Sequence, residues 1–144
     1  MRRLWPIPEA RQLDPVVPEG VRDRFAEGSR CENAGAYRGA AAMYRAAVEE
    51  LVHERGAVGR TLYDRIEALR SSLDQELITD LHEARMLGND SVHDGLTYSA
   101  DEVADVADLI IEMTEILYVH PARKARMRQE RQQRRAAARA TTVP

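Results

Sequence analysis

The chain has 144 residues, enough for one domain with a hydrophobic core, and 44% of them are apolar. Only 5% are aromatic, so Ala, Leu and Val carry the apolar content, a balance that favours packed helices over a sheet. The single cysteine, Cys31, excludes a disulfide framework and a cysteine-based metal site. No apolar run is long enough to cross a membrane, and residues 1–11 lack the apolar core of a signal peptide. We therefore expect a cytoplasmic protein.

The net charge of −3 conceals a strong asymmetry along the chain. Residues 1–120 carry 13 arginines and 23 Asp or Glu, a net charge of −10. Residues 121–144 carry eight basic residues and one acidic residue, a net charge of +7. We therefore divide the chain into a Pro-rich arm (1–18), a helical bundle (19–121) and a basic, Ala- and Arg-rich tail (122–144).

The arm holds four prolines, which prevent a helix and favour an extended segment. In the bundle, apolar residues recur at helical spacing. The predicted helices cover residues 21–33, 36–55, 61–69, 72–87 and 99–121. Ser72 and Ser99 are the expected starts of the last two, and Ser99 forms a capping box with Glu102. Short loops join these helices, which predicts an all-α, up-and-down bundle of four to five helices. The tail has no apolar face to bury, so it is either helical by propensity or disordered.

The stretch before residue 94 holds three candidate site residues. Arg85, Asn89 and His93 are spaced four residues apart, so a continuous helix would place them on one stripe. Arginine is suited to bind phosphate and histidine to transfer protons. RNA brings its own nucleophile, the 2′-hydroxyl, so an acid or base and a stabilising charge suffice to cut it. The alternative interpretation is that Gly88 and Asn89 end the helix, with Arg85 beside its last carbonyls and His93 in the loop.

Arg45 and Glu49 are a second candidate pair, four residues apart on the predicted helix 36–55. One interpretation is an ordinary surface ion pair. The other is that Arg45 points into a polar cleft and that Glu49 holds its guanidinium in place. None of the four histidines of the chain has a partner at metal-ligand spacing, so no metal site and no cofactor is predicted.

The tail begins with four candidate nucleic-acid-binding residues: Arg123, Lys124, Arg126 and Arg128. A run this basic can follow phosphates with a strong salt dependence. The tail has no aromatic residues for base stacking, so its binding would be independent of sequence. The alternatives are a solubilising, disordered end, or a tail that docks on a neighbouring subunit.

Several stretches, in the same order, resemble the family catalogued as domain of unknown function 4145, over about Phe25 to Ala122. They read AGAYRGAAAMYRAAVEELVHERG, TLYDRIEAL and LHEARMLGNDSVHD, and the Ser99–Pro121 helix follows. That family is similar to the HEPN group, named for higher eukaryote and prokaryote nucleotide-binding domains. The most specific parts are Tyr44-Arg45-x-x-x-Glu49 and Arg85-x-x-Gly88-Asn89-x-x-x-His93.

The resemblance implies a helical bundle, often a homodimer. HEPN ribonucleases bring an arginine and a histidine from each protomer to a dimer cleft. They cut RNA without metal in toxin–antitoxin, restriction and antiphage systems. Their usual motif has arginine five residues before the histidine, where this chain has Gly88. Asn89 and His93 match the asparagine and the histidine, and Arg85 or Arg45 is left to supply the guanidinium.

Two functions follow as expectations from this resemblance. The first is a metal-independent endoribonuclease of a defence or toxin–antitoxin system, with a homodimeric site and a protein partner such as an antitoxin. The second is a non-catalytic HEPN-like module that binds RNA or a partner protein, as a component of a phage or mobile element. No membrane association is expected in either case.

Overall fold

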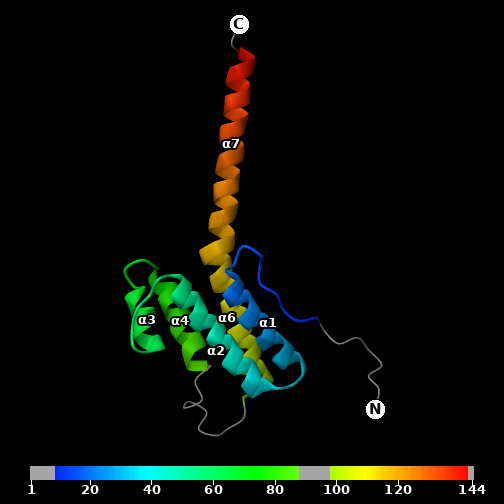
Figure 1. Ribbon diagram of the computed structural model, residues 1–144, viewed down its shortest axis with the longest axis vertical. Coiled ribbons are helices and arrows are strands. Elements are labelled where there is room, and N and C mark those ends of the chain that lie inside the picture. Colours follow the sequence, from blue (N-terminus) through cyan, green and yellow to red (C-terminus); the bar gives the residue numbers. More distant parts are fainter. Residues whose placement is uncertain (1–8, 88–97, 143–144) are drawn as a thin grey trace, which may run out of the picture.

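The computed structural model describes residues 9–87 and 98–142, and every regular element within them is helical. The elements are α1 (Glu19–Asn33), α2 (Tyr37–Glu54), α3 (Leu62–Ala68), α4 (Gln75–Leu87), α6 (Ala100–Thr114), the π-helical turn η1 (Glu115–Val119) and α7 (His120–Thr142). The helices α1 to α6 form a body, from which α7 projects as one long helix (Figure 1). The predicted all-α fold is therefore confirmed.

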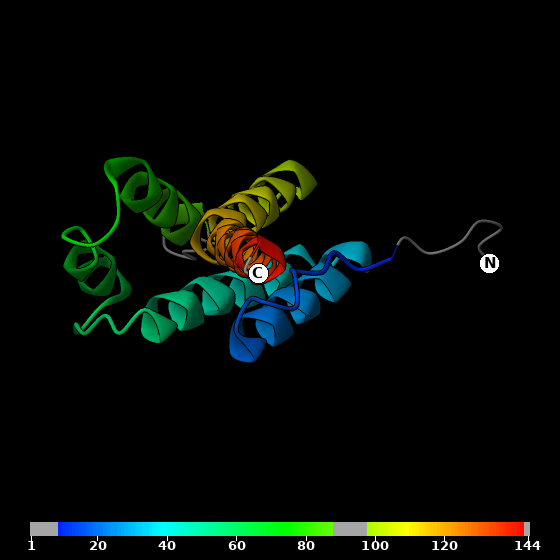
Figure 2. The ribbon, with the colours of Figure 1, turned by 90° about the horizontal axis from the view of Figure 1, so that it is seen from above.

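The helices α1 and α2 lie side by side and make the most extensive contact between elements (Figure 2). The chain turns between them at Gly35, whose φ of 76° suits glycine. The ring of Tyr44 on α2 is fully buried, 5.1 Å from the ring of Phe25, and its hydroxyl donates to Oε1 of Glu32 at 2.7 Å. Burial, together with this bond to Glu32, raises the pKa of Tyr44. The buried face of α1 consists of Val21, Phe25, Gly28 and Ser29.

The starts of α6 and α4 show one correct and one wrong capping prediction. At α6, the hydroxyl of Ser99 accepts from the Glu102 N–H at 3.1 Å, and the Glu102 carboxylate accepts from the Ser99 N–H at 3.2 Å, which is the predicted capping box. The predicted start at Ser72 is wrong. Helix α4 begins at Gln75, and Asp74 Oδ1 accepts from the N–H three residues later at 2.9 Å. Ser72 instead donates to the carbonyl of Leu69 in the turn after α3.

The described part of the arm, residues 9–18, lies against the body. Leu13 and Val17 are buried in the core. Arg11 pairs with Asp108 on α6 at 2.7 Å and with Glu32 on α1 at 3.4 Å. The arm therefore crosses from α1 to α6 and is held by both apolar and charged contacts.

The helix continues through Pro121, the residue at which the predicted bundle ends. Proline has no N–H, and its ring collides with the carbonyl four residues earlier in a regular α-helix, here that of Leu117. The π-helical turn η1 covers 115–119, and His120 separates it from the proline. The N–H of His120 bonds to the carbonyl of Glu115, five residues earlier, and this wider turn lets the helix continue through Pro121. The tail, for which the sequence left two states open, is helical as far as Thr142, and no residue of α7 is buried.

We expect Gly28→Ala to destabilise the protein because the ring of Tyr44 on α2 leaves no room for a Cβ there. A Cβ at position 28 would lie 2.6 Å from Cδ1 and Cε1 of Tyr44, a ring that is buried and bonded to Glu32. Overpacking of this kind costs about 1–3 kcal/mol, which urea denaturation would measure. Gly39→Ala is the matched control, since its Cβ would meet only the side chain of Cys31, with Sγ at 3.3 Å and Cβ at 3.8 Å. Equal denaturation midpoints for the two variants would contradict this account.

Candidate functional site

Arg45 extends from α2 toward the last turn of α4. Its Nε donates to Oε1 of Glu49 at 3.1 Å, so the predicted pair is present. Its Nη1 donates to the backbone carbonyl of Arg85 at 3.3 Å. The side chain is 30% exposed, so its guanidinium is held in place and still open to solvent. Arg45 therefore connects α2 to the end of α4.

Arg85 lies on an aromatic ring of α3. Its guanidinium carbon is 5.3 Å from the centroid of the Tyr63 ring, a cation–π distance. Its Nε donates to Nδ1 of His82 at 3.2 Å. Tyr63 is 49% exposed. The Arg85 guanidinium thus lies on a half-exposed aromatic ring of α3, and the Arg45 guanidinium bonds to the backbone of the same last turn of α4.

His82 connects this group to α3. Its Nε2 lies 2.8 Å from Oε2 of Glu67. Since Nδ1 accepts from Arg85, the proton of a neutral ring is on Nε2 and is donated to Glu67. Glu67 also accepts from Arg70 at 2.7 Å, and the bonds from Arg70 and His82 lower the pKa of Glu67. The residues that form the α2–α4 arginine site are Arg45, Glu49, Tyr63, Glu67, His82 and Arg85.

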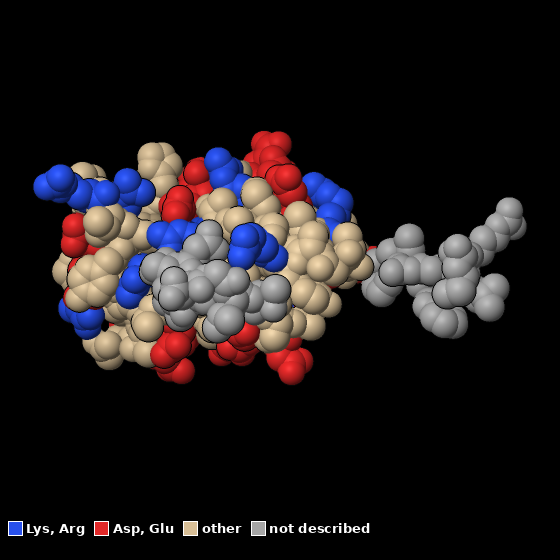
Figure 3. Space-filling model, turned by 90° about the horizontal axis from the view of Figure 1, so that it is seen from below, with Lys and Arg blue, Asp and Glu red and all other residues tan. Residues whose placement is uncertain are grey.

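The structure brings together three of the five predicted catalytic residues, namely Arg45, Glu49 and Arg85. The other two, Asn89 and His93, lie outside the described residues. Lys and Arg side chains are numerous on the α3 and α4 side of the body, at the left of Figure 3, with Asp and Glu among them and along the upper and lower edges.

Sequence reasoning missed Tyr63, Glu67 and His82. Glu67 with Arg70, and His82 with Arg85, are spaced three residues apart, which places each pair on one helix face. The three-residue spacing could therefore have predicted each of these two pairs separately. The bond between Glu67 and His82, fifteen residues apart, depends on how α3 packs on α4, which spacing does not reveal.

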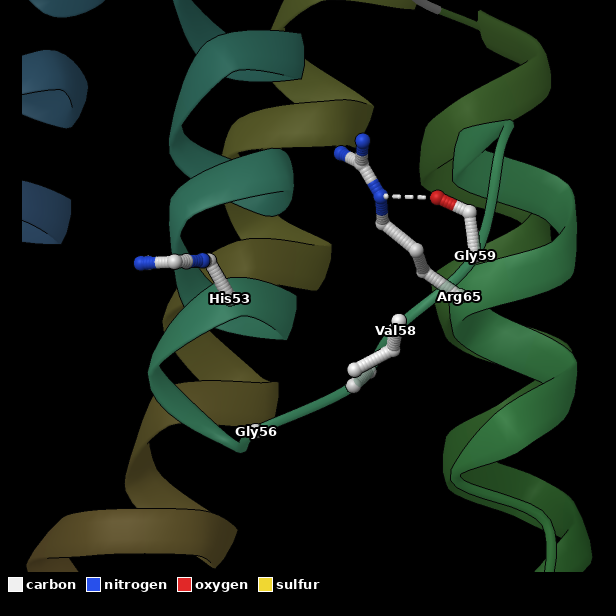
Figure 4. Close-up of a pocket in the computed structure, with 6 residues that line it drawn as sticks. His53, Gly56, Val58, Gly59 and Arg65 are labelled. Atoms are coloured by element: carbon white, nitrogen blue, oxygen red, sulfur yellow. Dashed lines mark hydrogen bonds between the residues drawn. The ribbon is translucent and has the colours of Figure 1, made fainter.

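A shallow hollow of about 360 Å³ lies where α2 ends and the chain enters α3 (Figure 4). It is lined by His53, Gly56, Ala57, Val58, Gly59 and Arg65. Nε of Arg65 donates to the carbonyl of Gly59 at 3.0 Å, and its terminal nitrogens point away from that carbonyl (Figure 4). The His53 ring points away from Arg65, and Glu49 and Glu50 line the adjoining hollow. The charges are mixed and do not converge, so this hollow is not a defined anion site.

The four predicted nucleic-acid-binding residues are exposed side chains of α7. With about 100° between successive residues of a helix, Lys124 and Arg128 lie on the same side, and Arg126 lies opposite them. Helix geometry thus separates a set that the sequence treated as one.

Over residues 9–87 and 98–142, no group of three or more His, Cys, Asp or Glu is placed to hold a metal ion. Within the same residues, no helix is both long and apolar enough to cross a membrane.

The fold and the site define an all-helical domain with an arginine-rich surface site between α2, α3 and α4. A family model described as Domain of unknown function (DUF4145) matches residues 26–130, and the chain belongs to this family. The matched part runs from α1 into the first half of α7 and includes the whole α2–α4 arginine site. No curated protein and no solved structure matches the chain.

We expect Arg70→Gln to raise the pKa of Glu67 toward its usual range, because the bond from Arg70 is the main cause of its lowering. A carboxyl whose pKa is lowered in the folded state stabilises the fold above its ordinary pKa, and this stabilisation is lost as the pH falls through the lowered pKa. The variant should therefore lose stability near neutral pH and match the wild type in strong acid. Carboxyl-carbon NMR and thermal denaturation across this pH range measure both effects.

The matched control is Arg60→Gln, which removes an exposed guanidinium just before α3. It should leave the Glu67 titration unchanged. If Glu67 titrates alike in the wild type and in Arg70→Gln, the assignment of the pKa shift to Arg70 is wrong.

Proposed function

We propose that this protein is an HEPN-like RNA-binding module that takes single-stranded RNA at the α2–α4 arginine site. The observation that carries the proposal is that Arg45 bonds to the backbone carbonyl of Arg85, while the Arg85 guanidinium lies over the half-exposed ring of Tyr63. Arginine guanidinium groups bind phosphates through paired N–H donors. Proteins recognise unpaired bases by stacking them on aromatic and guanidinium planes. The site has both kinds of group within one contact network.

The existing contacts of the two arginines favour a ligand rather than compete with it. Among the described residues, the Arg85 side chain is hydrogen-bonded only through Nε, to His82. Arg45 bonds through Nε and Nη1. The remaining terminal N–H groups can reach a phosphate, because a guanidinium has five donors. The bonds in place orient both planes before a ligand binds, which lowers the ordering cost of binding.

We expect Arg45→Gln and Arg85→Gln each to weaken the binding of a labelled single-stranded RNA about tenfold, because each removes one charge-assisted phosphate contact. Fluorescence anisotropy at fixed salt measures the dissociation constant. Arg38→Gln is the matched control, because Arg38 is an exposed arginine of the same helix α2, and the change in net charge is the same. An equal loss in Arg38→Gln and Arg85→Gln would show nonspecific attraction and would contradict a site.

A second candidate function is a metal-independent endoribonuclease of a toxin–antitoxin or other defence system, with the site completed by a homodimer. The specific observation that favours it is an imidazole, that of His82, oriented by the Glu67 carboxylate beside Arg85. Nδ1 is the basic nitrogen of this ring, so it exchanges the Arg85 N–H for the RNA 2′-hydroxyl before it takes that proton. The 2′-oxygen then attacks the adjacent phosphorus. The 5′-oxygen then leaves with a proton from an acid, and a cyclic phosphate remains. The resemblance to HEPN ribonucleases assigns the acid or base role to His93.

This second function predicts that the wild type cuts total RNA in the presence of a metal chelator, and that His93→Ala is slower by about a hundredfold or more, the usual contribution of a general acid or base. Gel electrophoresis of the RNA measures the rate. His82→Ala is the companion variant. Loss of cleavage in His82→Ala, with cleavage retained in His93→Ala, would move the role to His82. Absence of cleavage under every condition would contradict the enzyme and leave the RNA-binding module.

A further inference from the structure

The basic residues of α7 are arranged by helix geometry into a stripe. With about 100° per residue, five of the eight share an arc of about 80° and follow one another every three or four residues. These five residues, which we call the basic stripe, are Lys124, Arg128, Arg131, Arg135 and Arg139. Arg134 lies beside the stripe and lines a surface depression with Arg131 and Arg135. Arg126 lies on the opposite side of the helix.

Helix α7 lacks the features by which a helix contacts a protein or a single nucleic-acid strand. No residue of α7 is buried, and Met127, 47% exposed, is the only large aliphatic side chain in residues 120–142. Specific protein interfaces have an apolar core, and single-strand sites stack bases on aromatic rings. Because the stripe has neither, its chemistry is that of a row of cations alone.

We propose that the basic stripe binds the phosphate backbone of a double-stranded nucleic acid, without regard to sequence. A duplex carries one charge about every 1.7 Å of its axis, and the release of its condensed counterions drives the binding of cations. From Lys124 to Arg139 the stripe extends about 22 Å, at the rise of an α-helix. A row of this length therefore faces many phosphates at once. A single strand has a lower charge density and releases fewer counterions.

The position of α7 keeps most of the basic stripe away from the negative charge of the body. Residues 1–120 have a net charge of −10, which repels a phosphate backbone. On α4, burial first and then the neighbouring carboxylates, that of Glu112 foremost, raise the pKa of Asp80. Helix α7 projects away from this acidic body (Figure 1), so most of the length of the stripe lies away from it.

Most of the stripe belongs to the part of α7 that lies beyond the family match. The match ends at residue 130, so Arg131, Arg135 and Arg139 follow it. Duplex binding is therefore a property of this chain in addition to the proposed RNA site. It does not depend on that site, because the stripe and the α2–α4 arginine site share no residue.

The test uses the full-length protein and a labelled 24-base-pair duplex, as RNA and as DNA, beside a single strand of the same sequence. We expect both duplexes to bind more tightly than the single strand. The logarithm of the association constant should fall against the logarithm of salt concentration with a slope of about −3 to −5, for a stripe of five cations with partial contact. A variant with Lys124, Arg128, Arg131 and Arg135 all changed to Gln should lose at least tenfold in duplex affinity and most of the slope.

The matched control changes Arg30, Arg38, Arg60 and Arg126 to Gln, which removes the same charge from exposed positions outside the stripe. It should keep duplex affinity within about threefold and keep the slope. Circular dichroism checks that both variants retain their helices, since Gln is a good helix former.

Three outcomes would overturn the proposal. They are an equal loss in the stripe variant and the control, tighter binding of the single strand than of either duplex, and a stripe variant that changes only the oligomeric state. The proposed RNA site is distinguishable, because Arg45→Gln with Arg85→Gln should leave duplex affinity unchanged. Failure of that pair to affect single-stranded RNA would contradict the RNA site and not the stripe.

Discussion

The close contact of Tyr44 with Gly28 sets the rotation of α2, and the arginine site depends on that rotation. The buried ring lies where any Cβ at position 28 would collide with it, and its hydroxyl is bonded to Glu32. Successive helical residues differ in direction by about 100°. With Tyr44 fixed toward α1, Arg45 is directed toward α4, where it bonds to the carbonyl of Arg85. A core contact on one side of α2 thus positions a charged group on another side.

The other side chains of the arginine site are connected to this bond by a chain of contacts, and each contact orients the next side chain. Arg45 is held by Glu49, and Arg85 by the His82 ring and the face of Tyr63. Glu67 holds His82 from α3. Three helices contribute, so the site forms only when α3 and α4 are docked on α2. Exposed ion pairs of this kind add little stability, so their effect is the orientation of the guanidinium groups.

The sequence predicted what depends on short spacing and not what depends on packing between helices. The pair Arg45–Glu49 and the capping box at Ser99 follow from spacings of four and three residues, and both are present. Short spacing can also mislead, as the wrong helix start at Ser72 shows. Both Ser72 and Asp74 are polar residues suited to cap α4, and the cap is Asp74, the residue directly before the helix. The bond between Glu67 and His82 connects α3 to α4, and the spacing of residues within either helix does not indicate it.

The sequence pattern of the tail was compatible with a helix and with disorder, and the backbone is helical. A proline and the absence of an apolar face both indicated the end of the core, and burial does end near Leu117. The backbone nevertheless continues, because the π-helical turn at 115–119 accommodates a ring that a regular helix would exclude. A continuous helix converts a list of basic residues into a stripe with a direction. In a disordered tail the same charges would attract phosphates without an arrangement. The arrangement of charge on α7 therefore depends on the helix that continues beyond the turn at 115–119 and through the proline.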